Sequence, residues 1–449
     1  MNSPFRGFAS RRSTIARPAF ILLLGATAAT AQAQAPQDDT LRLTIAAARS
    51  AALRGNPELL AARSEIAIAR GQLRQAGILR FNPSADVLGL GWSTGSEIGL
   101  SQEIEIAGQQ GVRRAVARSG VARAEFLVAD AARVTLSDVD RGFYRSVAAD
   151  RRAILANEIL GLNERLAQVA TKQLAAGEIS KLDYNLSVIE LGRSRARAVA
   201  ARRERLQSGI ELRRLAGLPA GIPLAAAFDS AVHRHVAMDS GGIAPRMDLR
   251  GFGAGADTSI EPLVQGAIGR RPDLAERSAA VTQTGEDVTL ARREALPNLA
   301  ARIVSQRNEL GTGRTLRPGI GLSIPIFNRH QGEVESRMAL AERTRLERAA
   351  IARRVRADVE GAVRSYEAAA GEVEVLERTV LGPARDNRRL LEAAYREGKV
   401  GLPVLLLIRN QVIDAEQDYW TAWLAERVAE ADLRAALALP MSDDTRGRP

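Results

Sequence analysis

Cysteine is absent from this chain of 449 residues, and histidine occurs only three times. Without thiols there can be no disulfide, cysteine-ligated zinc, iron–sulfur cluster, thiol nucleophile or lipid anchor on cysteine. Aromatic residues make up 4% of the chain, too few for a surface that stacks nucleic-acid bases. We therefore predict no cofactor and no nucleic-acid partner.

A catalytic or metal-binding constellation is also missing. His233 and His235 lie two positions apart, and no third ligand lies near them to complete a zinc site. Glu103 and Glu105 have the same spacing, which on a strand puts both on one face. A glycosidase instead needs two carboxylates that converge across a cleft. We predict that the protein is not an enzyme and holds no resident metal.

The composition is that of an ordered chain, with 46% hydrophobic and 26% charged residues and a net charge of +11. The basic surplus is spread along the chain, which is typical of a solvated surface. Beyond the N-terminal region, no apolar run reaches the roughly 20 residues of a membrane-spanning helix. If the chain crosses a bilayer, it must do so with strands.

Residues 1–33 have the layout of a secretory signal peptide. Four arginines precede an apolar stretch over 19–29, and Ala31-Gln32-Ala33 follows as a small-residue cleavage site. The apolar stretch is shorter than the roughly 20 residues that a membrane anchor would need. We therefore expect export of the mature chain.

The mature chain repeats itself once. Tyr144 recurs as Tyr366 at an offset of 222, and Gly177 recurs as Gly398 at an offset of 221. Each half contains a helix, two short strands, a very long helix, a tight turn and a return helix. The predicted units are a first repeat over 34–219, a connector over 220–257, a second repeat over 258–440 and a tail over 441–449.

The predicted strands alternate between apolar and polar residues, and they cover about 84–92, 97–106, 298–306 and 316–327. Such strands suit a transmembrane barrel, although two hairpins packed on a soluble core would show the same alternation. The residues predicted to face lipid are Leu88, Leu90, Trp92, Ile98, Leu100, Ile104, Ile320, Leu322 and Ile324. Those predicted to line a watery lumen are Glu97, Glu103, Glu105 and Arg317.

Four strands cannot close a barrel, because about eight are needed even for a small one. Open strand edges cannot lie in lipid, where unpaired backbone groups are costly. If these strands are in a membrane, several chains must share one barrel, and three chains would supply twelve strands.

Long helical hairpins are predicted over 108–216 and 330–438. No proline occurs from Ala107 to Ala176, and these roughly 70 residues would reach about 105 Å as a helix. Apolar residues follow a heptad seam with charged flanks, so each helix should pack on neighbours. Pro383 is expected to interrupt the second long helix. A soluble coiled-coil adaptor would share these helices but would not explain the strand pairs.

The two helix–helix turns cover Ala176–Asp183 and Glu397–Val404. Helix capping accounts for Gly177, Gly398 and Ser180. It does not require the apolar residues of the turns, so we expect a partner to dock there. The predicted docking residues are Gly177, Glu178, Ile179, Ser180, Leu182, Asp183, Gly398, Lys399, Val400, Gly401 and Leu402.

Three segments carry a family resemblance: Arg-Gly-Asn-Pro-Glu-Leu at 54–59, Ser-Gln-Glu-Ile-Glu-Ile-Ala-Gly at 101–108 and Ile-Pro-Ile-Phe-Asn-Arg-His-Gln-Gly at 324–332. With the signal peptide and the duplicated body, residues 41–440 resemble the TolC-like outer-membrane efflux family. The resemblance implies a mainly α protein with a small β part: a homotrimer with a 12-stranded β-barrel and a 12-helix α-barrel. It also implies an outer-membrane location with a periplasmic extension, an RND-type inner-membrane pump and a periplasmic adaptor as partners.

Within this family, the second and third segments are similar to the cobalt–zinc–cadmium branch, which implies passive export of divalent heavy-metal cations. Export of organic compounds by the same kind of duct is the alternative, and a soluble periplasmic coiled-coil adaptor is an alternative of another class. The chain lacks the lipidated cysteine of some relatives, and Gly401 replaces the serine of the first turn. Asp386 and Glu392 lie on the stretch where a periplasmic aperture is expected.

Overall fold

The computed structural model describes residues 41–88, 97–221, 224–226, 260–307, 313–322 and 324–439. The predicted signal peptide, most of the connector and the tail lie outside the described residues, as do Leu90, Trp92, His233 and His235. The helices are α1 (Ile45–Gly55), α2 (Pro57–Ala76), α3 (Gln109–Ala175), α4 (Lys181–Leu215), α5 (Glu261–Arg270), α6 (Pro272–Glu294), α7 (Gln331–Val375), the π-helix η2 (Leu376–Leu381), α8 (Gly382–Arg396) and α9 (Leu402–Ala436).

The strands form two sheets. A four-stranded antiparallel sheet has the order β2 (Ser84–Leu88), β3 (Glu97–Ile104), β5 (Leu299–Arg307), β6 (Arg314–Leu322). The second sheet pairs β1 (Leu41–Leu43) in parallel with β4 (Leu224–Ala226). The second sheet ties the predicted connector to the start of the mature chain, which the sequence pattern did not predict.

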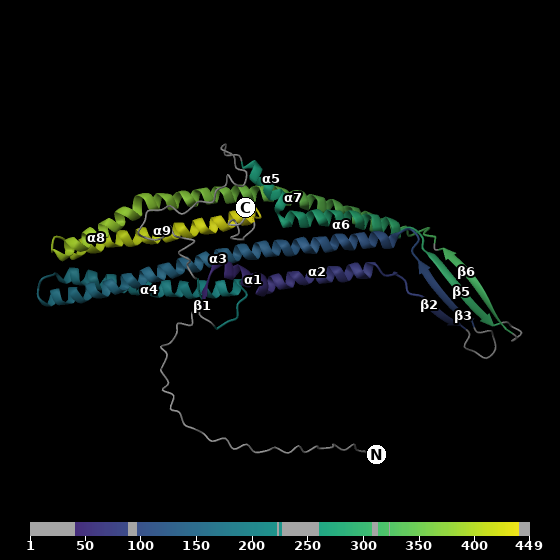
Figure 1. Cartoon of the computed structure of the whole chain (residues 1–449), viewed down its shortest axis with the longest axis horizontal. Coiled ribbons are helices and arrows are strands. Elements are labelled where there is room, and N and C mark those ends of the chain that lie inside the picture. Colours follow the sequence, from purple (N-terminus) through teal and green to yellow (C-terminus); the bar gives the residue numbers. More distant parts are fainter. Residues whose placement is uncertain are drawn as a thin grey trace, which may run out of the picture. The chain divides into compact units, whose positions relative to one another are not determined.

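The helix α3 runs without a break along the helical part, from the four-stranded sheet to the first helix–helix turn (Figure 1). Its 67 residues extend over about 100 Å. Near the four-stranded sheet, α3 packs between α2 and α6, and α7 packs on α6. Toward the helix–helix turns, α3 packs between α4 and α9, and α8 packs on α9. No described helix combines the length and apolar character that a membrane span requires.

The second long helix is interrupted near Pro383, as expected. Proline has no N–H to donate to the carbonyl of Thr379, and its ring crowds that carbonyl. The helix opens into the π-helix η2 over Leu376–Leu381 before α8 begins, and the Thr379 hydroxyl donates to the Val375 carbonyl at 2.6 Å. The Tyr419 hydroxyl of α9 donates to Glu377 of η2 at 3.2 Å and ties the wider turn to its neighbour.

The helical core combines alanines with larger aliphatic and aromatic residues. An edge-to-face cluster joins Phe143 and Tyr144 of α3 to Trp420 and Trp423 of α9. Arg49 of α1 donates to the buried Asp140 of α3 at 2.7 and 2.8 Å. Burial raises the pKa of Asp140, and Arg49 opposes that rise. This ion pair fixes the short helix α1 on the long helix α3.

The two halves share unusual backbone positions. Left-handed residues occur at Gly108 and at His330, its equivalent in the second repeat, and likewise at Gly177 and at Gly398. A third equivalent pair, Gly217 and Ala438, follows the last helix of each half. The recurrence of three left-handed positions in both halves is the structural counterpart of the sequence repeat.

Candidate functional site

The register of the four-stranded sheet decides which residues share a face, because directly opposite residues of antiparallel strands point the same way. Ile98 lies opposite Val87 and Ser305, and Leu100 lies opposite Ile303. One face is therefore almost wholly apolar, and its large side chains are Val87, Ile98, Leu100, Ile104, Leu299, Ile303, Leu316, Pro318, Ile320 and Leu322. The other face carries Asp86, Glu97, Ser101, Glu103, Arg302, Gln306, Thr315 and Arg317.

Within the described ranges, no helix lies across this sheet, and its strands pack mainly on one another (Figure 1). Every residue of β6 is exposed, and Ile320 is 82% exposed. A continuous apolar surface of this kind on one chain indicates contact with lipid or with another protein surface. The hairpins do not bury this face in a core of their own.

The register places most of the residues predicted to face lipid on one face of the sheet and most of those predicted to line the lumen on the other. Ile98, Leu100, Ile104, Ile320 and Leu322 lie on the apolar face. Glu97, Glu103 and Arg317 lie on the polar face.

Leu88 does not share a face with the other residues that were predicted to meet lipid. Leu88 lies opposite Glu97, on the polar face, and its neighbour Val87 occupies the apolar face. The error came from reading β2 by its own alternation, whereas pairing with β3 sets which set of residues joins Ile98.

Two further predictions fall beyond the strand ends. The strand β3 ends at Ile104, and Glu105 instead accepts a hydrogen bond from Arg113 of α3 at 3.0 Å. Glu105 is therefore a partner of the helix and not a free carboxylate of the polar face. Ile324 lies past the end of β6 at Leu322, before a proline that has no N–H for a strand ladder.

Most side chains of the polar face are hydrogen-bonded, ion-paired or exposed. The Asn298 side-chain amide donates to Glu103 at 2.8 Å, the Ser84 and Ser101 hydroxyls lie 2.7 Å apart, and Arg302 lies 3.8 Å from Glu97. Among the residues that the structure describes, no group of three metal-ligating side chains comes together. This face has the chemistry of a wet surface and not of a tight binding site.

The edges of the sheet, β2 and β6, have no strand partner among the described residues. Successive strands alternate in direction, so β2 and β6 run antiparallel to each other. The β6 edge of one copy and the β2 edge of another can thus pair as antiparallel strands. An unpaired edge offers a full row of N–H and C=O groups for such pairing.

The helix–helix turns form the second predicted site. In the first turn, Gly177 adopts φ +72°, and Ser180 and Asp183 form a reciprocal capping box at the start of α4. The second turn repeats the glycine conformation at Gly398 (φ +69°), but Gly401 begins α9 without a side-chain cap. The backbone path is shared, and the capping chemistry is not.

The docking prediction assumes that Ile179, Leu182, Val400 and Leu402 are exposed, and the structure differs from it at two of these residues. Leu182 is 68% exposed, and Val404 and Leu407 of α9 are exposed as well. Ile179 and Val400 are instead half-buried against a cluster that contains Leu391 and Leu405, because the ends of the two hairpins pack on each other. The side chain of Leu402 lies outside the described residues.

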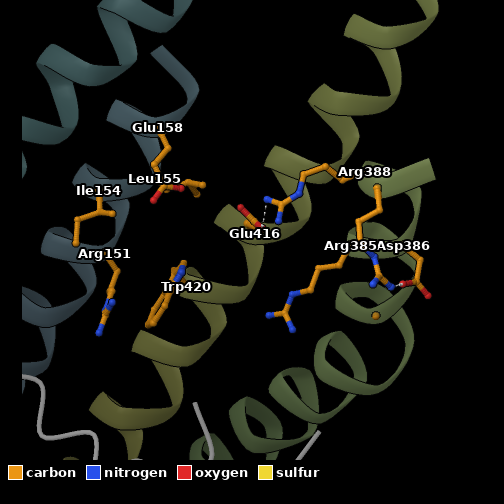
Figure 2. A pocket seen from close by; sticks show the side chains of 11 residues that line it. Arg151, Ile154, Leu155, Glu158, Arg385, Asp386, Arg388, Glu416 and Trp420 are labelled. Atoms are coloured by element: carbon orange, nitrogen blue, oxygen red, sulfur yellow. Dashed lines mark hydrogen bonds and ion pairs between the residues drawn. The ribbon is translucent and has the colours of Figure 1, made fainter. Parts of the chain in front are cut away.

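A hollow of about 550 Å³ lies between α3, α8 and α9 (Figure 2). Its lining is charged, with Arg151, Glu158, Arg385, Asp386, Arg388, Arg389 and Glu416 beside Ile154, Leu155, Gly382 and Trp420. Asp386, a predicted aperture residue, lies in this wall and pairs with Arg389 of its own helix. The side chain of Glu392, the other predicted residue, lies outside the described residues.

Glu416 is the functional candidate that sequence reasoning missed. It is buried on α9, 3.8 Å from Arg388, and burial raises the pKa of its carboxyl while Arg388 and Arg385 lower it. The sequence does hold a signal that could have identified Glu416. This acid lies at helical spacing from the apolar residues Val412, Tyr419 and Trp420, which are buried on the same helix.

Comparison with known proteins agrees with this geometry. Residues 263–439 match the family described as outer membrane efflux protein. The cobalt-zinc-cadmium resistance protein CzcC of Cupriavidus metallidurans is 22% identical over 390 residues, which cover 86% of each chain.

Solved structures share the fold. CusC, described in terms of folding and transmembrane channel formation, superposes with a TM-score of 0.70 at 18% identity, over 91% of this chain and 95% of its own. The CmeC outer membrane channel of Campylobacter jejuni gives a TM-score of 0.67 at 15% identity, over 88% of this chain and 85% of its own. These findings confirm the predicted resemblance to the outer membrane efflux protein family and the predicted outer-membrane location.

Proposed function

We propose that three copies of this chain form a passive exit duct for divalent heavy-metal cations across the outer membrane. An inner-membrane pump of the RND type would supply the energy, and a periplasmic adaptor would join the pump to the duct. The single observation that carries this proposal is the four-stranded sheet, which leaves its apolar face uncovered and both of its edges unpaired among the described residues.

Closure of the barrel follows from that observation. In hydrocarbon, every exposed N–H and C=O group of β2 and β6 would cost several kcal/mol, so the edges must find partners. Pairing of β6 with β2 of the next copy is antiparallel and repeats around a ring. Three copies give twelve strands, above the roughly eight that a barrel needs. The apolar face then meets lipid, and the polar face lines the lumen.

The long helices would continue the lumen into the periplasm. Four helices of each copy lie side by side at both ends of the helical part, so three copies supply twelve around a tunnel. At about 100 Å, α3 is long enough to reach far from the membrane. The proposed units remain the two repeats over 34–219 and 258–440, joined by the connector over 220–257.

The adaptor would dock on the turns, where Leu182, Val404 and Leu407 expose apolar surface. The aperture would lie beside the hollow of Figure 2, with Asp386 and Glu392 on its α8 side. A duct of this kind needs no tight substrate site, since the pump supplies both selection and energy.

The matching cobalt-zinc-cadmium resistance protein supports heavy-metal cations as the substrate class. The polar face of the sheet, with Asp86, Glu97 and Glu103 against Arg302 and Arg317, mildly favours cations over anions. Export of organic compounds is the second candidate, because a passive duct of this fold holds no tight site that would select one substrate class. A soluble coiled-coil adaptor would leave the apolar sheet face without a function.

Membrane assembly is tested with two adjacent substitutions on β3. Leu100→Glu places a charge on the apolar face, whereas Ser101→Glu places it on the polar face, opposite Arg302. A charge on the lipid face costs up to about 2–4 kcal/mol near the midplane, somewhat less for an acid. We expect Ser101→Glu to form a trimer in the outer-membrane fraction and Leu100→Glu to fail. Equal trimer yields from both would contradict the proposed facing.

Substrate class is tested in a host that lacks this gene. Restored growth on cobalt, zinc or cadmium salts, with lower cell-associated metal, supports the proposal. Protection against organic toxicants alone would favour the second candidate. Leu182→Asp should leave the trimer intact and abolish export, because the adaptor loses an apolar contact. Full metal resistance from Leu182→Asp would reject the docking role, and Leu182→Met serves as the matched control.

A further inference from the structure

The helix α4 exposes a row of residues on the side opposite its buried residues. The row advances in steps of three and four, which is the spacing of a coiled-coil seam. Its members, here called the α4 seam, are all exposed: Ile189, Gly192, Ala196, Val199, Arg203, Leu206 and Ile210. A hollow of about 460 Å³ lies in the middle of the seam, between Arg195 and Arg203. Within the described ranges α4 packs mainly on α3, so this seam stays uncovered in one copy.

The C-terminal part of α7 carries a matching row. Gly361, Arg364, Ala368, Gly371 and Val375 follow the same spacing on the side opposite the residues of α7 that are buried with α9, and we call them the α7 seam. Three of the five members are glycine or alanine, and Val375 is 58% exposed. Large aliphatic side chains on the α4 seam thus have a counterpart made mostly of small residues, as knobs have in holes.

The charges that flank the two seams are opposite in sign. Arg195 and Arg202 lie seven residues apart along one edge of the α4 seam, and Glu360, Glu367 and Glu374 recur every seven residues along one edge of the α7 seam. Both sets hold the position just before the first seam residue of each heptad. These positions face each other when two helices of a coiled coil run in opposite directions, and their charges select the partner helix.

The two seams lie at opposite ends of the row of helices. Toward the helix–helix turns, the order within one copy is α4, α3, α9 and then α7 with its continuation into η2 and α8 (Figure 1). The helix α4 runs from the turns toward the sheet, and α7 runs from the sheet toward the turns. A ring that repeats this row brings α4 of one copy against α7 of the next in antiparallel orientation.

We propose that the α4 seam of one copy and the α7 seam of the next form an antiparallel coiled coil, in which Arg202 pairs with Glu367 and Arg195 with Glu374. This inference rests on the proposed trimer and adds the residues by which one copy selects the next. The charges also exclude a pairing of α4 with another α4, because arginine would then face arginine.

Packing within one copy supports this register. The helices α3 and α9 also pack antiparallel, and the contacting residues of α3 lie two to eight positions farther from the glycine of their turn than their α9 partners do. Tyr144 precedes its turn glycine by 33 positions, for example, and Trp423 follows its own by 25. Glu367 precedes its turn glycine by 31 positions and Arg202 follows its own by 25, a difference of six.

The pair of Arg202 and Glu367 gives the sharper prediction. Among the described residues, neither has an ion-pair partner within its own chain. Arg195, in contrast, already lies 3.7 Å from Glu164 of α3. A new partner across the interface should therefore contribute more at Arg202 than at Arg195.

Two arginines interrupt the seams themselves. Arg203 and Arg364 have long apolar stems that can cover the seam while their charges reach its edge. Arg364 lies four positions after Glu360 and three before Glu367, so acids of its own helix balance its charge. Both arginines are thus compatible with a coiled coil whose α7 edge is acidic.

Charge exchange tests the ion pairs in outer-membrane trimers of the full-length protein. Arg202→Glu and Glu367→Arg each bring like charges together and should lower the temperature at which the trimer dissociates by about 3 °C or more, read on semi-native gels. The double variant should regain the wild-type temperature. Arg197→Glu makes the same charge change at an exposed position of α4 outside the seam and should have no effect. A double variant without recovery, or an equal loss in Arg197→Glu, would overturn the pairs.

Cross-linking tests the seam without changing its charges, since the chain has no native cysteine. Val199→Cys combined with Gly371→Cys puts one thiol on each seam at the same level, and oxidation in outer membranes should yield covalent dimers and trimers. Val199→Cys combined with Ala357→Cys moves the second thiol by 14 residues, about 21 Å along the same face, and should yield none. No product with position 371, or an equal yield with position 357, would overturn the seam and leave this face of α4 to another partner such as the adaptor.

The same preparations separate the seam from the proposed duct. If wild type forms outer-membrane trimers that confer metal resistance and the cross-link at positions 199 and 371 is absent, only the seam fails. If wild type does not form trimers in the outer membrane, the proposed function fails and the seam fails with it.

Discussion

The return helices of the two halves, α4 and α9, occupy equivalent places in the repeat but have opposite surroundings. Val199 of α4 is 71% exposed, whereas Trp420, the equivalent residue of α9, is 4% exposed. Leu206 and Arg427 show the same contrast. The helix α9 packs on α3, α7 and α8, whereas α4 packs mainly on α3.

This difference shows which half completes the subunit and which half is left open. The helix α9 contributes Trp420 and Trp423 to the core, so the second half closes the fold of one copy. The helix α4 presents Val199, Leu206 and Ile210 to the outside. In the proposed ring, α4 is the helix that meets the next copy, and its apolar residues would be covered there.

The largest expected effect separates these two helices. Trp423→Ala should lower the free energy of unfolding by about 3–5 kcal/mol, because it empties a fully buried site in the core. Leu206→Asp should leave the helical content of the chain unchanged and weaken trimer formation. Circular dichroism and native mass spectrometry measure the two effects. If the Leu206→Asp chain were unfolded, or formed trimers as well as wild type, the contrast drawn between α4 and α9 would be wrong.

The helix ends after α4 and α9 give the next largest effect. Both end in a residue of left-handed conformation with the same pair of backbone hydrogen bonds, but Gly217 packs against Gly55. A Cβ at position 217 would lie 2.3 Å from the Gly55 carbonyl carbon. We expect Gly217→Ala to destabilise the protein by about 3 kcal/mol or more.

The matched substitution in the second half should change the stability in the opposite direction. Ala438 already adopts φ +48°, so Ala438→Gly should stabilise the chain by about 0.5–1 kcal/mol through relief of backbone strain. Melting temperatures of the two variants decide the matter. A lower melting temperature for Ala438→Gly would show that the two ends are not equivalent.

Substitutions at the N-terminal caps of α4 and α9 should change the stability by a smaller amount. Ser180→Ala removes the capping box of α4 and should cost about 1 kcal/mol. Gly401→Ser offers α9 the cap that it lacks and should gain a few tenths of a kcal/mol, since glycine is itself a tolerated cap. Hydrogen exchange at the first turn of each helix measures both. Equal protection in all variants would contradict the role of these caps.

The smallest effect depends on pH. Burial raises the pKa of Glu416, so the folded state holds its proton more tightly than the unfolded state, and stability falls as pH rises above the ordinary value of 4.5. Glu416→Gln should be more stable than wild type at neutral pH, and the difference should vanish below pH 4.5. Arg195→Gln, at the equivalent exposed position of α4, should be nearly neutral. A neutral-pH loss in Glu416→Gln would show that its pairing with Arg388 outweighs burial.

Local signals in the sequence were enough for the long helices, the turn glycines and the break at Pro383, because these depend on near neighbours in the chain. The facing of β3 and β6 was also readable from their alternation. Which residues of β2 share a face with Ile98 depends on how β2 pairs with β3. That pairing cannot be read from the residues of β2 alone, and Leu88 was assigned to the wrong face for that reason. Glu105 and Ile179 were misread because their partners, Arg113 and the second hairpin, are tertiary contacts.

The central claim is that the four-stranded sheet faces hydrocarbon on one side and water on the other. The absence of native cysteine allows a clean test by single-cysteine substitution along β5 in assembled outer membranes. A water-soluble maleimide should label the positions of Ala300, Arg302, Val304 and Gln306 and leave those of Leu299, Ala301, Ile303 and Ser305 unlabelled. Uniform labelling along β5, or labelling of the second set alone, would contradict the account.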